Sequence, residues 1–493
     1  MVEHLAILPT LIPVVTAALL LLPVFANAKF ARRVLSGAGF FLTLACAVGL
    51  ALQVNYGPQL YQLGNWPAPF GIVLFADRIA ATLVILTSAL MIGGWLYSCG
   101  RDDTQDPFFQ ALLHFLLMGI NGAFLTGDLF NLFVFFEVLL ISSYGLLIHG
   151  GGKNRVRAAL HYVLLNLVGS ALFLFALAIL YSQLGSLEIQ DMGRRITALP
   201  ESSQFIVQSA AGLLLVVFGL KAAMLPFHFW LPTAYRQAPP VVACVFAVMT
   251  KVGVYSLWRV FTTLFSQDAG LLAGFGQSFI VGCGLLTMLM AVFVLLSSPD
   301  LRGIVAALVL MSAGTLLSVV GMGTVITDAA VLYYAAHSTL ACGALFLLTD
   351  IIAVQRGNLS DRIARGRKLQ YQLATGWAFA LLAMAVIGMP PLSGFIGKIQ
   401  LLQAASESAW KYPFWVVLIL TTVITMVVMS RAGSSIFWRL MPGQSNGQPV
   451  SNWQWAGLIW LSGCLVMMVL LAAPMLEYFQ LAAVEFSKPL RGD

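Results

Sequence analysis

The stretch FIVQSAAGLLLVVFGLKAAMLPFHFW, residues 205–230, decides the fold. It is apolar and long enough to cross a bilayer, which takes about 20 residues. Yet it contains Lys221 and, five residues later, Pro226. A lysine at bilayer depth costs about 2.5–3.5 kcal/mol, and a proline there frees backbone groups that lipid cannot satisfy. The stretch therefore predicts a transmembrane helix with a break near Lys221 that lets water reach the lysine.

The composition of the whole chain is that of a membrane protein. Of its 493 residues, 60% are hydrophobic and 9% are charged, which is outside the range of soluble domains. The net charge of +7 therefore reports on membrane sidedness, and no nucleic-acid partner is expected. Six cysteines lie singly in apolar stretches without C-x-x-C spacing. We therefore expect no iron–sulfur cluster, zinc site, disulfide framework or other cofactor.

We expect an all-α polytopic protein with about fourteen transmembrane helices, the first of them retained. An even number puts both termini on one side. With this count, sixteen of the 26 lysines and arginines fall in inner loops and helix ends and seven in outer ones. This bias places both termini on the outer side of the membrane. The expected spans lie near residues 5–25, 34–54, 72–97, 108–127, 129–148, 158–183, 206–225, 239–262, 271–296, 301–320, 324–352, 370–402, 413–438 and 453–480.

A second break is expected at GMPPLSGFIGK, residues 388–398, which contains Pro390, Pro391 and Lys398. Each break belongs to the fourth helix of a five-helix set, and the second helix of each set opens with an acidic turn, GDLF or PDLR. An odd-numbered repeat places its two copies in inverted orientation, and paired broken helices commonly mark ion sites. Plain proline kinks are the alternative. We divide the chain into N-terminal helices (1–100), a first repeat broken near 221–230 (101–265), a second repeat broken near 388–398 (266–440), and a C-terminal helix with its tail (441–493).

Five ionisable residues are expected far from either membrane surface. The three lysines and the glutamate together cost about 10 kcal/mol to insert, so we favour groups that face a hydrated interior and act there. A structural role, with each group satisfied by a carbonyl or a neighbouring helix, is the alternative and has most weight for the histidine. The five residues are Glu137, Lys221, Lys251, His337 and Lys398.

Proton transfer is the chemistry that these residue types permit. Burial disfavours the charged form of a lysine, and a nearby carboxylate favours it again. Movement of a carboxylate can therefore load or release a proton near neutral pH. Glu137 is the one deep acid available to Lys221, and the other three residues would extend the path. His228, just past Pro226, is expected on the inner side, either as a proton entry point or in a cap or packing role.

Several motifs resemble signatures of the proton-translocating antiporter superfamily, which includes the membrane subunits of respiratory complex I and of Mrp-type multisubunit antiporters. The motifs are GDLFNLFVFFEVLLISSYGLL, GLKAAMLPFHFWLPTAYRQAP, MTKVGVYSLWR and GMPPLSGFIGK. Two further stretches, GPQLYQLGNWPAPFGIVLFADR and HSTLACGALFLLTD, resemble the D-type subunit of the Mrp (also Pha or Mnh) antiporters in particular. The resemblance implies proton-path roles for the same five deep residues. This chain departs from the family pattern at Phe246, Ala341 and Cys342, where many members carry polar or basic groups. Water molecules or other side chains, such as Tyr333 or Tyr334, must therefore complete the path.

The resemblance implies secondary transport by one subunit of a hetero-oligomeric Na+/H+ or K+/H+ antiporter, driven by the proton gradient, and no enzyme activity. The alternative is an antiporter-like subunit of NADH:quinone oxidoreductase, whose middle homologue often has glutamate at the position of Lys398. A pure scaffold is a third possibility, which the deep charges disfavour. The metal site is unknown, because no residue set resembles a sodium cage. Basic loops at 150–157 and 362–370 are expected at the lipid headgroups, and Asp77 is expected to pair with Arg78.

Overall fold

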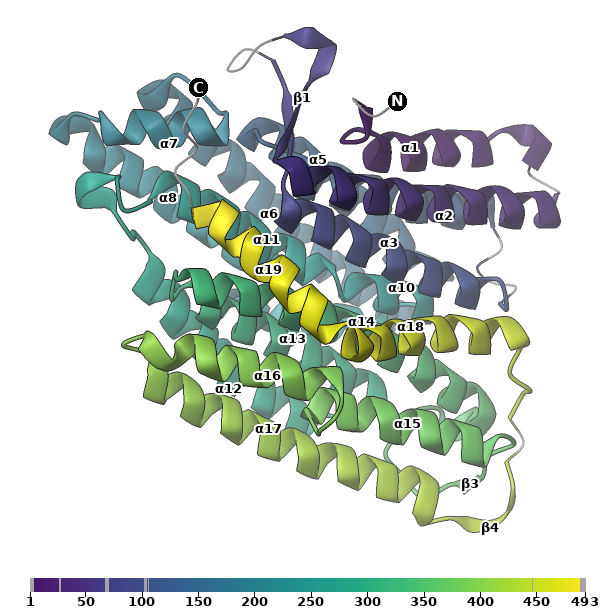
Figure 1. Cartoon of the computed structure of the whole chain (residues 1–493). Coiled ribbons are helices and arrows are strands. Elements are labelled where there is room, and N and C mark those ends of the chain that lie inside the picture. Colours follow the sequence, from purple (N-terminus) through teal and green to yellow (C-terminus); the bar gives the residue numbers. More distant parts are fainter. Residues whose placement is uncertain are drawn as a thin grey trace.

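The computed structural model describes residues 4–25, 28–66, 71–101, 104, 106–445 and 447–487. The chain forms one elongated bundle whose long helices run roughly parallel or antiparallel to a common direction (Figure 1). The α-helices are α1 (Leu8–Leu20), α2 (Lys29–Gln53), α3 (Arg78–Ser98), α4 (Pro107–Leu125), α5 (Leu129–Ile148), α6 (Lys153–Leu184), α7 (Ile189–Thr197), α8 (Glu201–Lys221), α9 (Trp230–Gln237), α10 (Pro240–Phe246), α11 (Met249–Leu264), α12 (Gln277–Ser297), α13 (Leu301–Val320), α14 (Val325–Arg356), α15 (Gln372–Ile387), α16 (Ser393–Ala404), α17 (Lys411–Gly433), α18 (Asn452–Leu470) and α19 (Ala472–Ser487).

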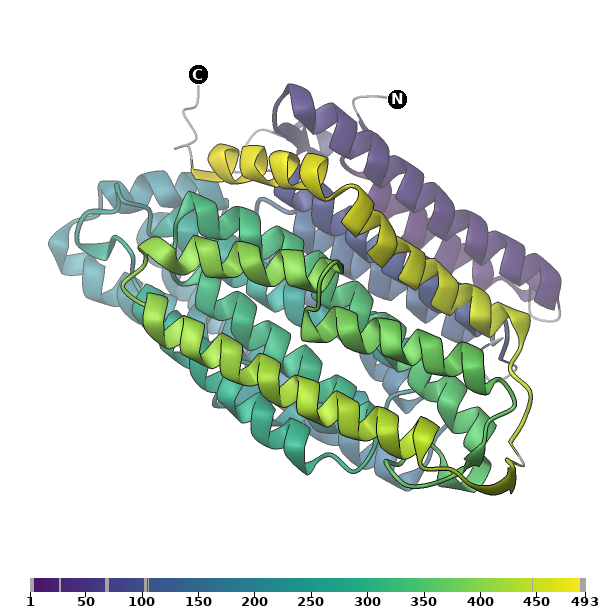
Figure 2. The same cartoon turned by 60° about the horizontal axis from the view of Figure 1, so that its bottom comes forward.

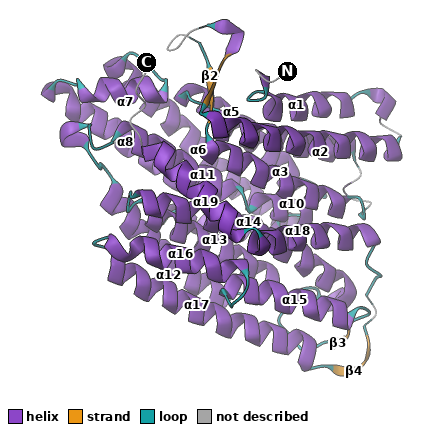
Figure 3. Ribbon diagram, viewed as in Figure 1, coloured by secondary structure: helices purple, strands orange, loops and turns teal. Residues whose placement is uncertain are grey.

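Strands are confined to connections between helices (Figure 3). The strands β1 (Gln59–Gln62) and β2 (Val73–Ala76) pair antiparallel, with Gln59 opposite Ala76. The strands β3 (Arg367–Lys368) and β4 (Met441–Gln444) pair parallel. The protein is thus all-α in its spanning part, as the sequence predicts.

Twelve helices in the described residues are long and apolar enough to cross a membrane, with α10 and α11 counted as one. The sequence predicts about fourteen spans, and the difference has two sources. The expected helix at 5–25 is represented by α1, which has only 13 residues. The expected helix at 370–402 is divided into α15, with 16 residues, and α16, with 12, by the break at its prolines. Each piece is too short to count as a span by itself.

The two halves of the bundle share local features. Both α6 and α14 contain 32 residues. Both α5 and α13 begin at an aspartate whose carboxylate accepts a hydrogen bond from the N–H three residues on, as N-cap residues do. These bonds join Asp128 to Asn131 N at 2.7 Å and Asp300 to Gly303 N at 2.9 Å. Each aspartate also forms an antiparallel bridge to the segment after the long helix, to Glu188 and Arg362 respectively.

The core is centred on α14, which is buried along nearly its whole length together with α11 and α13. The C-terminal pair α18 and α19 bends and crosses over the bundle, as Figures 1 and 2 show. The hydroxyl of Tyr333 on α14 donates to the carbonyl of Met468 on α18 at 3.1 Å. The expected helix at 453–480 therefore corresponds to two helices that cover the core.

Two ion pairs join segments that are far apart in the sequence. Asp77 pairs with Arg259 through bonds of 2.6 and 2.8 Å, and Arg78 pairs with Glu485. The expected pair between Asp77 and Arg78 is therefore wrong. Asp77 is the N-cap of α3 and its side chain accepts from Ala80 N. The adjacent Arg78 is the first residue of the helix and turns to a different neighbour.

Candidate functional site

The first broken helix consists of α8, a short irregular turn and α9. The helix α8 ends at Lys221, Ala223 has a positive φ of 56°, and the Leu225–Pro226 peptide is cis. Side chains bond backbone groups at the break: Trp230 Nε1 donates to the Leu220 carbonyl at 3.1 Å, and Leu225 N donates to Thr287 Oγ1 at 2.8 Å. The Leu220 carbonyl also accepts from Ala223 N at 3.2 Å. The turn is therefore held by specific bonds at membrane depth.

Lys221 is buried, with 5% of its surface exposed, and its ammonium contacts side chains of α5 and α6. Its Nζ donates to Asn166 Oδ1 at 3.3 Å and lies 5.5 Å from the centre of the Phe136 ring. Glu137, on α5, accepts a hydrogen bond from Ser170 on α6. Within the described residues no direct ion pair joins Glu137 and Lys221. Asn166 and Ser170 are one turn apart on α6, so this helix connects the two charges.

The backbone of Lys221 packs directly against α11. A Cβ placed on Gly253 would lie 2.6 Å from the carbonyl carbon of Lys221 and 2.5 Å from the nitrogen of Ala222. No side chain fits at such distances. Gly253 is only two residues from Lys251, so this glycine sets how closely the helices of the two lysines approach.

The second broken helix consists of α15, a turn with a cis Pro390–Pro391 peptide, and α16. Lys398 on α16 donates from Nζ to the Ile387 carbonyl at 2.9 Å and to Thr422 Oγ1 on α17, also at 2.9 Å. Ile387 is the last residue of α15, so the lysine satisfies a carbonyl that the break leaves free.

The side chain of His337, which belongs to α14, packs against the first residues of α16. Its Nδ1 forms a hydrogen bond of 2.9 Å with Ser393 Oγ, and a Cβ on Gly394 would come within 2.8 Å of its Nε2. The ring of Tyr334 lies 6.2 Å from the imidazole. The histidine is therefore fixed against the second break, one turn before Ala341 on the same helix.

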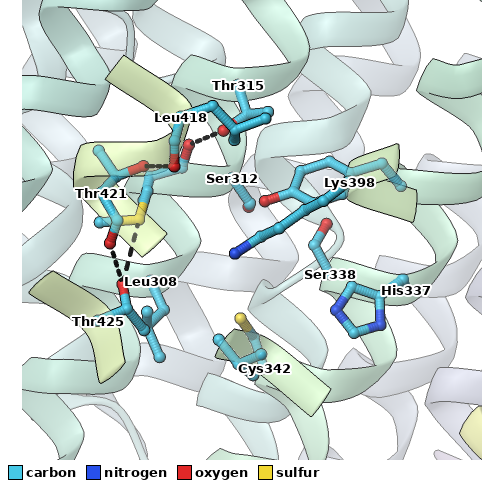
Figure 4. Close-up of a pocket in the computed structure, with 13 residues that line it drawn as sticks. Leu308, Ser312, Thr315, His337, Ser338, Cys342, Lys398, Leu418, Thr421 and Thr425 are labelled. Carbon is cyan, nitrogen blue, oxygen red and sulfur yellow. Dashed lines mark hydrogen bonds between the residues drawn. The ribbon is translucent and has the colours of Figure 1, made fainter. Parts of the chain in front are cut away.

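A small cavity connects three of the deep residues (Figure 4). Its volume is about 20 Å³, which is enough for one water molecule. Lys398 points into it, with His337 and Ser338 on one side and Thr421 and Thr425 on the other. Lys251 reaches the same cavity through Ser312, to which its Nζ donates at 2.8 Å. Cys342, one of the departures from the family pattern, also lines it.

Aromatic side chains gather near the junction of the two halves. The ring of Tyr162 lies 5.1 Å from that of Trp230 and 6.3 Å from that of Phe246. Tyr235 donates from its hydroxyl to the Phe246 carbonyl at 2.6 Å. Trp230 contacts the residue before Lys221, and Phe246 precedes Lys251 by five residues. The sequence predicts a shortage of polar links at Phe246, and the structure places rings there.

His228 lies in the turn between α8 and α9 and is partly buried. Its ring contacts the neighbouring Phe229 edge-on, with 6.4 Å between the ring centres. In the part of the chain that the structure describes, no hydrogen bond joins it to Lys221. A role in proton entry stays a prediction.

Sequence reasoning missed the polar side chains that contact each deep charge. Hydroxyl and amide residues are common in transmembrane helices, where they often bond their own backbone, so their presence alone is a weak signal. The four-residue spacing of Asn166 and Ser170 was one available sign. The missed residues are Asn166, Ser170, Ser312, Ser393 and Thr422. The described residues contain no group of three or more His, Cys, Asp or Glu side chains that could hold a metal ion.

Comparison with known proteins identifies the family. Residues 126–425 match the model of the transmembrane family NADH:quinone oxidoreductase/Mrp antiporter. The D subunit of a probable K+/H+ antiporter of Rhizobium meliloti is 38% identical, with 99% of this chain and 96% of the relative covered. The D subunit of the Na+/H+ antiporter of Bacillus subtilis is 33% identical over 95% and 93%. The chain belongs to this family and, within it, to the D-type subunits of Mrp antiporters.

A solved structure agrees with this membership. A chain in the Mrp complex from Dietzia sp. DQ12-45-1b matches with a TM-score of 0.87 at 25% identity, covering 99% of this chain and 98% of that one. The predicted resemblance to the D-type subunit is thereby confirmed. The match also extends beyond residues 126–425 to the N-terminal helices and to α18 and α19.

Proposed function

We propose that this chain is the proton-translocating subunit of a hetero-oligomeric Na+/H+ or K+/H+ antiporter in the bacterial cytoplasmic membrane. The observation that carries the proposal is its similarity, over 99% of its length, to the D subunit of a probable K+/H+ antiporter. The arrangement of the deep charges supports it, because each one contacts a polar group of a neighbouring helix. The chain is a transporter subunit that works with partner subunits, and the proton gradient drives it.

Two clusters of polar side chains have different roles in proton transfer. In the first, Glu137 and Lys221 are connected through Asn166 and Ser170 of α6. Because neither charge is locked in a direct pair, a small shift of α5 or α6 changes how strongly the carboxylate stabilises the charged lysine. That change loads or releases the lysine's proton. The pair of Glu137 and Lys221 is therefore the switch that couples proton transfer to cation movement.

In the second cluster, Lys251, His337 and Lys398 meet at the cavity of about 20 Å³. One water molecule there has Ser312, Tyr334, Ser338 and Lys398 around it, which supplies the two to four polar partners that a buried water uses. It would bridge Lys251 to Lys398 where this chain has Ala341 and Cys342.

The topology that fits this mechanism has fourteen spans: the twelve long helices, α1, and the broken helix formed by α15 and α16. Both termini then lie outside. The repeats 101–265 and 266–440 are inverted relative to each other. This assignment of inverted repeats is supported by the two 32-residue helices, α6 and α14, and by the matching aspartate bridges described above. The N-terminal helices (1–100) and the C-terminal segment (441–493) flank them.

The second candidate is an antiporter-like subunit of NADH:quinone oxidoreductase, because the family model covers both kinds of protein. The two are distinguished by what drives exchange. Inside-out vesicles from cells without their own antiporters would contain the chain with its partner subunits and be energised by ATP. Collapse of the pH gradient on addition of Na+ or K+ supports the antiporter, whereas an assembled complex that responds only to NADH supports the respiratory enzyme.

Variants test the mechanism in the same vesicles. Lys221→Ala and Glu137→Ala are each expected to abolish exchange while the complex still assembles. Ser209→Ala, an exposed position on α8 whose hydroxyl bonds its own helix, serves as the control and is expected to exchange normally. Normal exchange in either Lys221→Ala or Glu137→Ala would contradict the proposed switch.

A further inference from the structure

A cavity of about 510 Å³ lies at the end of the bundle formed by α7, the first turn of α14 and the last turn of α19. In the proposed topology this end faces the outer solution. Most of the charges that line the cavity are neutralised by partners or exposed at its mouth. Asp77 is paired with Arg259, Glu485 is paired with Arg78, and Arg194 and Asp268 are exposed.

Asp328 differs from these charges. It lines the cavity but has only 5% of its surface exposed, and no basic side chain of the described residues lies within 4.0 Å of its carboxylate. Its Oδ1 accepts a hydrogen bond of 2.9 Å from Trp258 Nε1. The helix α14 does not need it as a cap, because Thr324 and Thr327 already form a capping box. A buried carboxylate thus faces an open cavity without a structural task at the helix terminus.

Asp328 and its partner connect this cavity to the helices of the proton path. His337 follows Asp328 by nine residues on α14, about 14 Å along the helix axis. Trp258 follows Lys251 by seven residues on α11, about 10 Å. The bond between Asp328 and Trp258 therefore joins the outer ends of the two helices that carry Lys251 and His337.

We propose that Asp328 is the group through which protons from the outer solution enter the path. This proposal rests on the proposed antiporter function. A hydronium ion in the cavity gives its proton to the carboxylate, leaving water and the neutral acid. The acid then passes the proton inward along a transient chain of water molecules beside α14 towards His337, and the carboxylate is restored. A bound Na+ or K+ would need several convergent oxygens, and here one oxygen of a single carboxylate is already engaged by Trp258.

The test uses the assembled complex in ATP-energised inside-out vesicles, whose acidified lumen corresponds to the outer side. Asp328→Asn keeps the size and the oxygen that accepts from Trp258 but cannot bind a proton. We expect at least a tenfold loss of exchange rate, with normal assembly and an unchanged cation concentration for half-maximal response. Asp328→Glu should recover most of the rate. Asp268→Asn makes the same change at the mouth of the cavity and should stay within twofold of the wild type.

Trp258→Phe tests whether Asp328 matters as a proton-binding group or only as the acceptor of the Trp258 hydrogen bond. It removes the donor but leaves the carboxylate, so exchange should persist. An Asp328→Asn complex with more than half of the normal rate would overturn the proposal. Failure of the Asp328→Asn complex to assemble would also overturn it, because an isosteric change would then break the structure. A tenfold rise in the cation concentration for half-maximal response would overturn it too, because that rise would indicate cation binding at Asp328. If the wild type itself shows no exchange, it is the antiporter function that fails.

Discussion

Lys398 Nζ donates a hydrogen bond of 2.9 Å to the carbonyl of Ile387, the residue at which the first half of its broken helix ends. The lysine therefore stabilises the break as well as lining the central cavity. At the first break the carbonyl of Leu220 accepts hydrogen bonds from the indole of Trp230 at 3.1 Å and from Ala223 N at 3.2 Å. Among the described residues, Lys221 donates to the Asn166 side chain and bonds no carbonyl at its break. Both broken helices combine a lysine with a proline break, but in the part of the chain that the structure describes only at the second break does the lysine bond a carbonyl that the break leaves free.

This difference predicts unequal effects of one substitution. Lys398→Met removes the donor of a carbonyl at membrane depth and should cost about 1–3 kcal/mol of stability. Lys221→Met removes a donor only from the Asn166 side chain, so its cost should be smaller. Thermal unfolding of the two purified complexes measures both. Equal shifts of the midpoint would show that the Ile387 bond adds nothing.

The connection between Glu137 and Lys221 gives a second prediction. Asn166→Asp is nearly isosteric and places a carboxylate 3.3 Å from Lys221 Nζ. Opposite charges at this distance attract by about 5 kcal/mol at an effective dielectric constant of about 20, so the lysine should hold its proton too strongly. We expect at least a tenfold loss of exchange without loss of assembly. Asn166→Gln, which brings no charge, is the control and should lose less. Unchanged exchange in Asn166→Asp would mean that Lys221 need not release its proton.

Features with a strong local signal could be predicted from the sequence. The long apolar runs predict most of the helices, and the prolines at 226, 390 and 391 lie in the turns between α8 and α9 and between α15 and α16. Two spans are shorter than expected because apolar composition continues across a break or past a helix end, as at α15. Hydrophobicity reports burial, but it does not report where the backbone leaves the helix.

Long-range pairs could not be predicted, because they depend on how helices pack. Asp77 bonds Arg259, 182 positions away, while its sequence neighbour Arg78 bonds Glu485. The expected approach of Glu137 to Lys221 rests on a shortage of other acids, but Asn166 and Ser170 come between them. Which hydroxyl contacts Lys251 or Lys398 follows from the rotation of α13 and α17, and one sequence contains no measure of that rotation.

The buried pair of Asp77 and Arg259 supplies a third prediction. Arg259 is also surrounded by the rings of Phe75, Tyr255 and Phe486. Asp77→Ala leaves this guanidinium buried without its counter-charge, a change that typically costs about 3–5 kcal/mol. The matched control is Asp191→Ala, which breaks the exposed pair with Arg195 and should cost about 0–1 kcal/mol. Thermal unfolding of both complexes checks the ranking, and comparable losses would contradict it.

The contact between Gly253 and Lys221 gives the last prediction. A Cβ at Gly253 would lie 2.5 Å from Ala222 N and 2.6 Å from the Lys221 carbonyl carbon, and both atoms belong to backbone that is fixed by the break. Gly253→Ala must therefore push α8 and α11 apart, which should cost about 1–3 kcal/mol as overpacking does. It should also move Lys221 away from Asn166, so exchange should fall further than stability. Gly212→Ala, on the same helix as Lys221, meets no atom within 4 Å and should leave both properties unchanged. Measurement of unfolding and cation-dependent exchange on both variants distinguishes a spacing role from general sensitivity of α8, because normal exchange in Gly253→Ala would show that the close approach of these helices is not required for transport.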